Sequence, residues 1–182
     1  MSTVSERYDR VAAGFAIRLD GLGARAWDAP TPCTDWSVRD LVAHVVAVHG
    51  RVAANVVSQP AHDVDPGGDL ADQWRRAAEV VRDALRDEAL ASTVVGGMFG
   101  EQSFESLVGR LLCADTVVHT WDLARASGQD ETLDPDAVAA AAQFLATLDD
   151  AIRRPGGMGP KIEPAPGADG QTRLLNFCGR RV

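Results

Sequence analysis

The sequence predicts an all-α fold. Apolar residues recur at intervals of three and four along five segments, which is the spacing of an amphipathic helix. Residues that begin or end helices flank these segments, and no internal repeat or convincing strand pattern occurs. The 182 residues suffice for one domain with a substantial core, so we expect a single domain over 1–182 with an irregular tail from about residue 155.

The first expected helix covers about residues 5–22. Val11 and Phe15 lie on its apolar stripe, and glycines follow it. A loop with Pro30 and Pro32 comes next, since each proline removes a backbone donor and fixes φ. We therefore expect a long irregular connection between the first helix and the second.

The second expected helix covers about residues 38–57. Ser37 and Asp40 have the spacing of a capping box, in which the serine caps the helix and the residue three positions later reaches back. His44 lies on the apolar face of this helix. His49 is displaced from His44 by about 140° around the helix axis, so one site is not expected to use both imidazoles.

The third and fifth expected helices support the bundle. The third begins at the cap signal of Asp69 and extends to about residue 90, before an irregular passage that contains glycines. The fifth begins at Asp134, with Pro135 at its first position, and should end at Pro155–Gly157. Its apolar residues form a seam along one face of the helix: Val138, Ala141, Leu145, Leu148 and Ile152. This seam could pack on the bundle or on a second subunit, so a homodimer is a possible assembly.

The fourth expected helix carries the chemistry. Ser103 should cap it, and Gly128 stands where a left-handed residue would end it. Asp115 and His119 are four residues apart, so both lie on one face of this helix and point at the same volume. The third candidate ligand is His44, because helical bundles build metal sites from inward-pointing side chains on facing helices.

The expected ligand set, two imidazoles and one carboxylate, suits zinc, nickel or iron(II), and leaves a position for water or substrate. Alternatively, a core histidine can be satisfied by a hydrogen bond, and an Asp-x-x-x-His pair can arise by chance. Asp122 lies one turn after His119 and Asp40 one turn before His44, so each could orient an imidazole as an outer carboxylate. For both aspartates, a helix cap or a surface salt bridge is the alternative.

The composition argues against several classes of protein. The formal charge is −8, the pI is about 4.9 and no basic run is longer than a pair of arginines such as Arg180-Arg181, so nucleic acid is not an expected partner. The N-terminus has no apolar signal core and no segment approaches the ~20 apolar residues of a membrane span, so we expect a cytoplasmic protein without a membrane partner. Scattered cysteines without a CxxC pattern argue against a disulfide framework and a thiolate zinc finger; they are Cys33, Cys113 and Cys178.

Two motifs make the sequence recognisable. TPCTDWSVRDLVAHVV at 31–46 and DTVVHTWDLARASG at 115–128 resemble the DinB/YfiT-like metalloenzyme superfamily, in the branch related to the N-terminal domain of mycothiol-dependent maleylpyruvate isomerase. RLLNFCGR at 173–180 looks like the closing segment of the short metal-binding members. The resemblance implies a four-helix bundle with a crossover connection and additional peripheral helices.

The resemblance also implies the ligands. The first motif's histidine falls on His44; the second motif's acidic ligand falls on Asp115, where the isomerase has glutamate, and its histidine falls on His119. In the family these ligands bind zinc or a similar divalent ion, with mycothiol as a thiol cofactor. The isomerase has a second domain that helps to form its active site, whereas only a short segment follows the fifth helix here, so maleylpyruvate isomerisation itself is not expected.

We therefore expect an enzyme that depends on a divalent metal, with zinc foremost and nickel or iron as alternatives. Its activity would be a mycothiol-dependent transfer or isomerisation of a small electrophilic substrate, in which the metal holds the thiol as a thiolate. The alternative is a non-catalytic metal-binding or ligand-sensing bundle. The count of three ligands favours catalysis, whereas no residue of the expected pocket is an obvious general acid or base.

Overall fold

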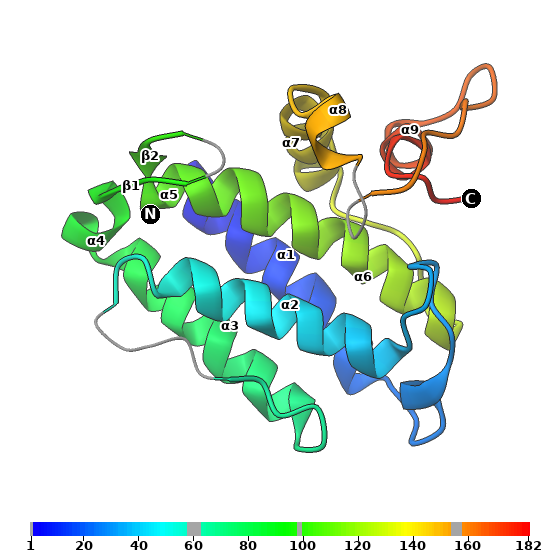
Figure 1. The fold of residues 1–182 in the computed structure, drawn as a ribbon, viewed down its shortest axis with the longest axis horizontal. Coiled ribbons are helices and arrows are strands. Elements are labelled where there is room, and N and C mark those ends of the chain that lie inside the picture. Colours follow the sequence, from blue (N-terminus) through cyan, green and yellow to red (C-terminus); the bar gives the residue numbers. More distant parts are fainter. Residues whose placement is uncertain (1, 58–62, 98–99, 154–157) are drawn as a thin grey trace.

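The computed structural model describes residues 2–57, 63–97, 100–153 and 158–182 (Figure 1). Almost all of the regular structure in these ranges is helical, which confirms the predicted all-α class. No helix within these ranges is both long enough and apolar enough to cross a membrane.

Four long helices form the bundle: α1 (Thr3–Asp20), α2 (Val38–Ala53), α3 (Leu70–Arg86) and α6 (Cys113–Ser127). α1 packs on α3 and α6, and α2 packs on the same two helices, so α1 and α2 occupy opposite corners (Figure 1). The connection between them contains the short helix η1 (Ala26–Asp28) and crosses one end of the bundle.

Local capping signals begin the helices where the sequence predicts. Ser37 and Asp40 form the capping box of α2. The side chains of Asp69, Ser103 and Asp134 each accept a hydrogen bond from a backbone N–H in the first turn of the helix that follows. A cap depends only on residues that are close in sequence, which is why these starting points are readable without tertiary information.

The segment expected as one continuous helix after Ser103 has three parts. α5 (Phe104–Leu107) leads into a π-helical turn, η2 (Val108–Leu112), and then into α6. The wide turn lies where Gly109 faces α1: a Cβ atom on Gly109 would stand 2.9 Å from Cγ1 of Val4. The turn is thus associated with a close approach between two helices, which the local sequence pattern does not reveal.

The third expected helix is divided near its end, and the irregular passage after it contains two short strands that the sequence does not predict. Asp87 ends α3 and caps a short helix, α4 (Glu88–Ser92). β1 (Val94–Val95) and β2 (Gln102–Ser103) then pair in antiparallel fashion. Strands of two residues are too short to leave an alternating pattern in the sequence, so only the pairing itself reveals them.

The C-terminal part of the chain packs against α6. α7 (Pro135–Ala146) starts at the expected proline, α8 (Asp149–Ile152) follows it, and α9 (Gly170–Phe177) lies near the C-terminus. The helix end expected at Pro155–Gly157 lies outside the described residues. The predicted seam of α7 packs within the chain, in a buried cluster shared with α6 and α9 that includes Val138, Ala141 and Leu145.

A larger core lies between α1, α2, α3 and α5. Its buried aromatic side chains include Tyr8, Phe15 and Trp74, and the rings of Phe15 and Trp74 are 4.7 Å apart between centroids. Burial of each such side chain contributes about 1.5–3 kcal/mol. These apolar side chains pack against one another directly, so the bundle has a substantial core that does not need an ion at the candidate site to form.

Candidate metal centre

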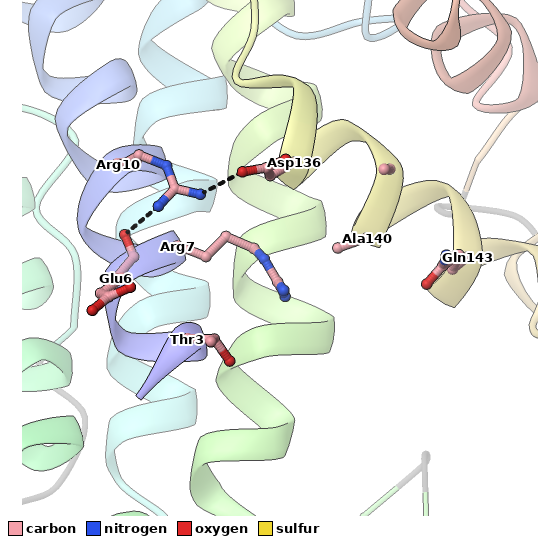
Figure 2. Close-up of a pocket in the computed structure, with 8 residues that line it drawn as sticks. Thr3, Glu6, Arg7, Arg10, Asp136, Ala140 and Gln143 are labelled. Atoms are coloured by element: carbon pink, nitrogen blue, oxygen red, sulfur yellow. Dashed lines mark hydrogen bonds and ion pairs between the residues drawn. The ribbon is translucent and has the colours of Figure 1, made fainter. Parts of the chain in front are cut away.

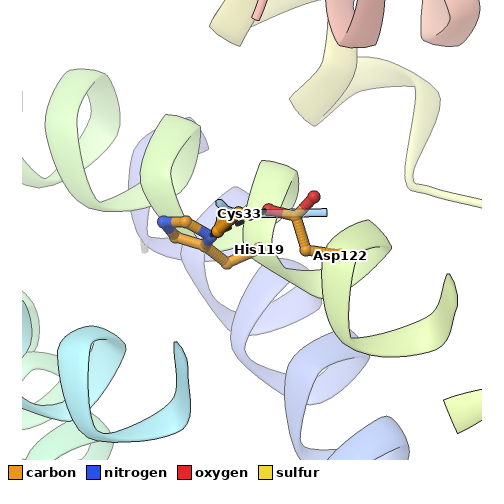
Figure 3. A group of neighbouring side chains, drawn as sticks. All are labelled: Cys33, His119 and Asp122. Atoms are coloured by element: carbon orange, nitrogen blue, oxygen red, sulfur yellow. Dashed lines mark hydrogen bonds and ion pairs between the residues drawn. The ribbon is translucent and has the colours of Figure 1, made fainter. Parts of the chain in front are cut away.

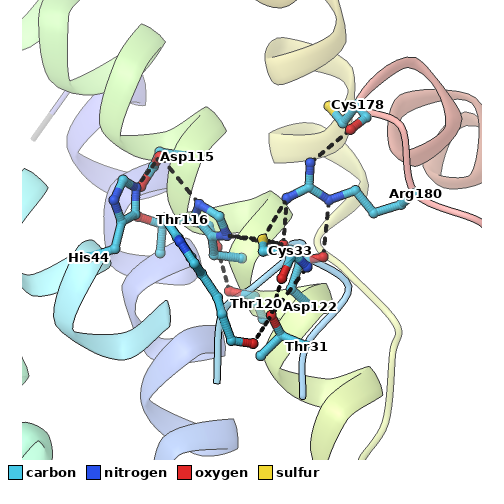
Figure 4. Close-up of polar contacts among 11 residues, drawn as sticks. Thr31, Cys33, His44, Asp115, Thr116, Thr120, Asp122, Cys178 and Arg180 are labelled. Atoms are coloured by element: carbon cyan, nitrogen blue, oxygen red, sulfur yellow. Dashed lines mark hydrogen bonds and ion pairs between the residues drawn. The ribbon is translucent and has the colours of Figure 1, made fainter. Parts of the chain in front are cut away.

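His44, Asp115 and His119 converge where α2 faces α6; Figure 4 shows His44 and Asp115 side by side. Nε2 of His44 lies 3.3 Å from Oδ1 of Asp115, and Nε2 of His119 lies 3.6 Å from the same oxygen. One nitrogen or oxygen atom from each residue lies within 4.8 Å of the other two. The three residues thus permit a metal site, because an ion could bind all three donors at once. That they bind a metal stays a prediction.

Local structure on both helices positions these side chains. The capping box at Ser37 fixes the start of α2, and His44 follows on the face that meets α6. On α6, Asp115 and His119 both lie after the π-helical turn, so their four-residue spacing keeps them on one face. Gly128 ends α6 with a φ of 69°, the left-handed conformation that the sequence predicts for it.

Two carboxylates, Asp115 and Asp122, lie beside His119 in a largely buried cluster. Burial alone would raise the pKa of Asp115, but the imidazoles of His119 and His44 hold it below its ordinary value. Burial likewise opposes protonation of His119, yet Asp115 and Asp122 raise the pKa of this imidazole to about 10. The same carboxylate charges would stabilise a metal cation, which has to displace the proton of His119 when it binds.

One carboxylate oxygen gives direct support for the fit of a metal ion. Oδ2 of Asp115 is buried and has no hydrogen-bond partner among the described residues. A buried carboxylate oxygen without a partner is unfavourable, and coordination of an ion would satisfy it. Together with two imidazole nitrogens, this carboxylate completes a donor set that suits zinc and similar divalent ions.

Asp122 contacts the ring of His119 from behind. Nδ1 of His119 lies 3.0 Å from Oδ2 of Asp122, a residue with 0% exposure. Since Nδ1–H donates to this carboxylate, Nε2 is left facing Asp115. This position is the one expected of an outer carboxylate that orients a ligating histidine.

Asp40 has the other of its two expected roles. Its Oδ2 accepts hydrogen bonds from the backbone N–H of Ser37 at 2.9 Å and from the Ser37 hydroxyl at 2.6 Å. These bonds hold the pKa of the exposed Asp40 carboxyl below its ordinary value. Asp40 therefore caps α2, and none of its contacts in the described structure involves His44.

A second group of donor atoms lies on the far side of His119 and consists of Cys33, His119 and Asp122 (Figure 3). The Cys33 thiol donates to Oδ2 of Asp122 at 3.3 Å, and its sulfur lies 3.8 Å from Nδ1 of His119. Asp122 is already paired with Arg180 at 2.7 Å, so a cation in this group would lie beside a guanidinium. The group of His44, Asp115 and His119 is therefore the better candidate for a metal.

Trp36, in the loop before α2, covers the two candidate imidazoles. Its ring centroid lies 4.8 Å from that of His44 and 6.0 Å from that of His119. The Thr31 hydroxyl donates to the Trp36 carbonyl at 3.0 Å, and Asp35 turns the loop with a φ of 67°. The indole therefore shields one side of the candidate ligands from water.

His49 lies apart from the centre, as its displacement around α2 predicts. Its Nδ1–H donates to the carbonyl of Val45 at 2.9 Å, and its ring contacts Trp74 edge to face with centroids 4.7 Å apart. Complete burial lowers the pKa of His49 to about 4. His49 is thus a neutral core residue.

Sequence reasoning misses Trp36 and Arg180 as parts of this centre. Trp36 lies in an irregular loop without periodicity, and Arg180 appears only as half of a terminal basic pair. The single signal for Arg180 is the segment RLLNFCGR at 173–180, which resembles a family segment but does not indicate what its arginine contacts.

A separate cavity of about 410 Å³ lies between α1 and α7 (Figure 2). Arg7, Arg10, Asp136 and Gln143 are among the residues that line it, and Arg10 forms ion pairs with Asp134 and Asp136. Its lining includes no histidine or cysteine, and none of the three candidate ligands contributes to it. The cavity is therefore not part of the candidate metal centre.

Comparisons with known proteins identify the family. Residues 8–124, which include all three candidate ligands, match the family model described as the mycothiol maleylpyruvate isomerase N-terminal domain. The chain is also 32% identical over 180 residues to uncharacterised proteins of Mycobacterium tuberculosis strains CDC 1551 and H37Rv, with 96% of this chain and 96% of each relative covered. No solved structure matches the chain. The chain therefore belongs to the family of the mycothiol maleylpyruvate isomerase N-terminal domain.

Proposed function

We propose that this chain binds one divalent metal ion, zinc foremost, through His44, Asp115 and His119, and uses it for mycothiol-dependent transfer or isomerisation of a small electrophilic substrate. The observation that carries the proposal is the convergence of three donor atoms within 4.8 Å from two facing helices. The buried, unpartnered Oδ2 of Asp115 supports it. Nickel and iron are the alternative ions, because the same donors suit them.

A bound divalent ion lowers the pKa of a thiol that coordinates it, which makes the thiol a nucleophile near neutral pH. The protein's own residues would prepare that position. His44, Asp115 and His119 bind the ion, Asp122 receives the Nδ1–H of His119, and three protein ligands leave a position for the thiol sulfur. Trp36 excludes water from one side of the imidazoles.

The thiol part of the proposal is supported by the family, whose description names mycothiol. In this mechanism the thiol itself is the nucleophile, so no protein base has to remove its proton during the attack. This fits the surroundings of the candidate ligands, where the adjoining charged groups Asp122 and Arg180 are already paired with each other.

The pairing of Asp122 with Arg180 also favours a second candidate function, a metal-binding or ligand-sensing bundle without catalysis. A general acid or base needs a proton that it can exchange with substrate. Asp122 is fully buried and bonded to Arg180 and His119, so it offers none. An enzyme and a sensor would differ in whether a small thiol reaches the metal.

Cobalt substitution tests this difference, because a thiolate bound to Co(II) adds a sulfur-to-metal charge-transfer band in the near ultraviolet. Only Cys33 among the cysteines lies beside the candidate ligands; Cys113 and Cys178 are buried, and burial raises their pKa to about 12 and about 11. A Cys33→Ser background therefore suffices to remove the protein's own thiol from the measurement.

We expect the band to appear when mycothiol is added to the Co(II)-loaded Cys33→Ser protein. It should be absent when Asp115→Ala is combined with Cys33→Ser, since that variant loses a ligand. A spectrum that is indifferent to mycothiol while Co(II) stays bound would contradict thiol chemistry and favour the sensing bundle.

A further inference from the structure

The buried side chain of Arg180 reaches the rear of the candidate metal centre from the segment after α9 (Figure 4). Its Nε donates to Oδ1 of Asp122 at 3.1 Å, and its Nη2 donates to Oδ2 of the same carboxylate at 2.7 Å. Arg180 is 9% exposed and Asp122 is 0% exposed. Such a two-bond pairing is geometrically specific, so it fixes the rotation of the carboxylate.

The C-terminal segment holds Arg180 in turn. Nη1 donates to the carbonyl of Cys178 at 2.8 Å, the backbone N–H of Arg180 donates to the carbonyl of Leu175 at 2.8 Å, and the Asn176 side chain donates to the carbonyl of Arg180 at 2.9 Å. Burial opposes the charge of Arg180, but Asp122 raises the pKa of the guanidinium. The guanidinium therefore enters the centre charged and in a fixed orientation.

These contacts form an uninterrupted series from Arg180 to the candidate ligands. Oδ2 of Asp122 accepts from Arg180 and, at 3.0 Å, from Nδ1 of His119. Because the guanidinium holds both carboxylate oxygens, Oδ2 stays where Nδ1 of His119 can donate to it. Nε2 of His119 then keeps facing Asp115. Outer hydrogen bonds of this kind fix the ring orientation of metal-ligating histidines.

We propose that Arg180 is a positioning residue of the metal centre, which acts through Asp122 to hold the His119 imidazole in its ligating orientation. The inference rests on the proposed metal binding by the three candidate ligands. Arg180 lies outside residues 8–124, the part of the chain that matches the family model. The C-terminal segment thus supplies the centre with a group from beyond the matched domain.

A merely structural role for Arg180 has to be distinguished from positioning. Its Nη2 also donates to the sulfur of Cys33 at 3.1 Å, in the loop that carries Trp36. Arg180 therefore ties both this loop and the C-terminal segment to α6, and its loss could lower stability without affecting the ligands. The test consequently needs a property that responds to the ligands themselves.

The test measures the affinity of the full chain for Co(II), by competition with a chromophoric chelator. We expect Arg180→Gln and Asp122→Asn each to weaken binding by about 10- to 100-fold. The double variant should bind no more weakly than either single variant, because all three lack the same link. Arg181→Gln changes the exposed neighbouring arginine and is the matched control, which should bind with wild-type affinity.

The visible absorption of the bound Co(II) provides the second property, because it responds to ligand geometry rather than to overall stability. Arg180→Gln and Asp122→Asn should alter it in the same way. Arg180→Lys keeps the charge but loses the two-bond pairing, so its affinity should fall between those of wild type and Arg180→Gln. If a buried unpaired charge prevents a single variant from folding, the double variant, which leaves no such charge, is compared with wild type instead.

The outcomes separate this inference from the proposed function. If Arg180→Gln keeps the wild-type affinity and spectrum while His119→Ala binds no Co(II), the inference is overturned and the proposed metal site stands. If the losses of the two single variants multiply in the double variant, Arg180 does not act through Asp122, and the inference is again overturned. A wild-type chain that binds no Co(II) overturns both.

Discussion

His119 presents Nδ1 to Oδ2 of Asp122 at 3.0 Å, on the side of the ring away from the candidate ligands. The relationship leaves Nε2 of His119 directed at Asp115, 3.6 Å away. One ring nitrogen of the imidazole, Nδ1, is thus hydrogen-bonded to a buried carboxylate, and the other, Nε2, is available to a metal ion.

The first prediction concerns the buried pair of Arg180 and Asp122 in metal-free protein. Arg180→Gln should lower the free energy of unfolding by about 3–5 kcal/mol, because it leaves the Asp122 carboxylate buried without its guanidinium. Urea denaturation with a chelator present measures the change. Arg181→Gln, at an exposed position, should stay within about 0.5 kcal/mol of wild type. Equal stability of the two variants would contradict the assigned pairing.

A second prediction concerns the pH dependence that comes from His49. Burial lowers the pKa of His49 from 6.5 to about 4, so below pH 6.5 the unfolded chain takes up a proton that the folded protein excludes. Stability from this group is therefore complete above pH 6.5 and is lost as the pH falls towards 4. Between pH 7 and pH 5, wild type should lose about 2 kcal/mol more than His49→Phe, whose ring does not titrate.

Urea denaturation of both proteins at the two pH values checks this difference. A chelator must be present, because metal binding would add its own pH dependence. Other titrating groups are shared by the two proteins and cancel in the comparison. Parallel losses in wild type and His49→Phe would show that His49 is not held neutral by burial.

The fold could be predicted from the sequence wherever local signals determine it. Ser37, Ser103 and Asp134 cap helices as predicted, because a cap needs only neighbours along the chain. Gly128 likewise adopts its predicted left-handed conformation. The π-helical turn beside Gly109 could not be predicted, since it is associated with a tertiary contact to α1.

The candidate site was likewise predictable where spacing along one helix or a family motif indicates it, and not where it depends on tertiary contacts. The spacing of Asp115 and His119 on one helix, together with the resemblance that points to His44, predicts the convergence that the structure contains. Arg180 could not be predicted, because it lies 58 positions after Asp122 and no periodic pattern links them. Asp40 and Asp122 have similar spacings from a histidine in the sequence. Only the structure distinguishes them, because Asp40 is exposed and caps α2, whereas Asp122 is buried and pairs with Arg180.

A third prediction concerns removal of the metal. An ion that binds only the folded chain at a thousandfold excess over its Kd adds about 4 kcal/mol, so a chelator should lower the melting temperature by roughly 10 °C. The helical circular dichroism at 25 °C should persist, because two clusters of buried apolar side chains hold the helices together without an ion. His119→Ala should not respond to the chelator. Complete unfolding on chelation would instead indicate a structural ion.

The fourth prediction uses Trp36 as a local reporter. Its ring lies against those of His44 and His119, so a paramagnetic ion such as Co(II) at the candidate site should quench its fluorescence strongly. Trp36→Phe should abolish most of the quenching that Co(II) produces. Trp27→Phe is the control, since Trp27 stacks under Arg39 instead, and it should retain the effect. Quenching that survives in Trp36→Phe would place the ion elsewhere.

The most direct test of the central claim is the metal content of the purified chain, measured by elemental analysis after exposure to zinc and removal of unbound ions. We predict about one ion per chain in wild type and in His49→Phe, and loss of most of it in His44→Ala and in His119→Ala. Full metal content in both His44→Ala and His119→Ala would contradict the proposed centre.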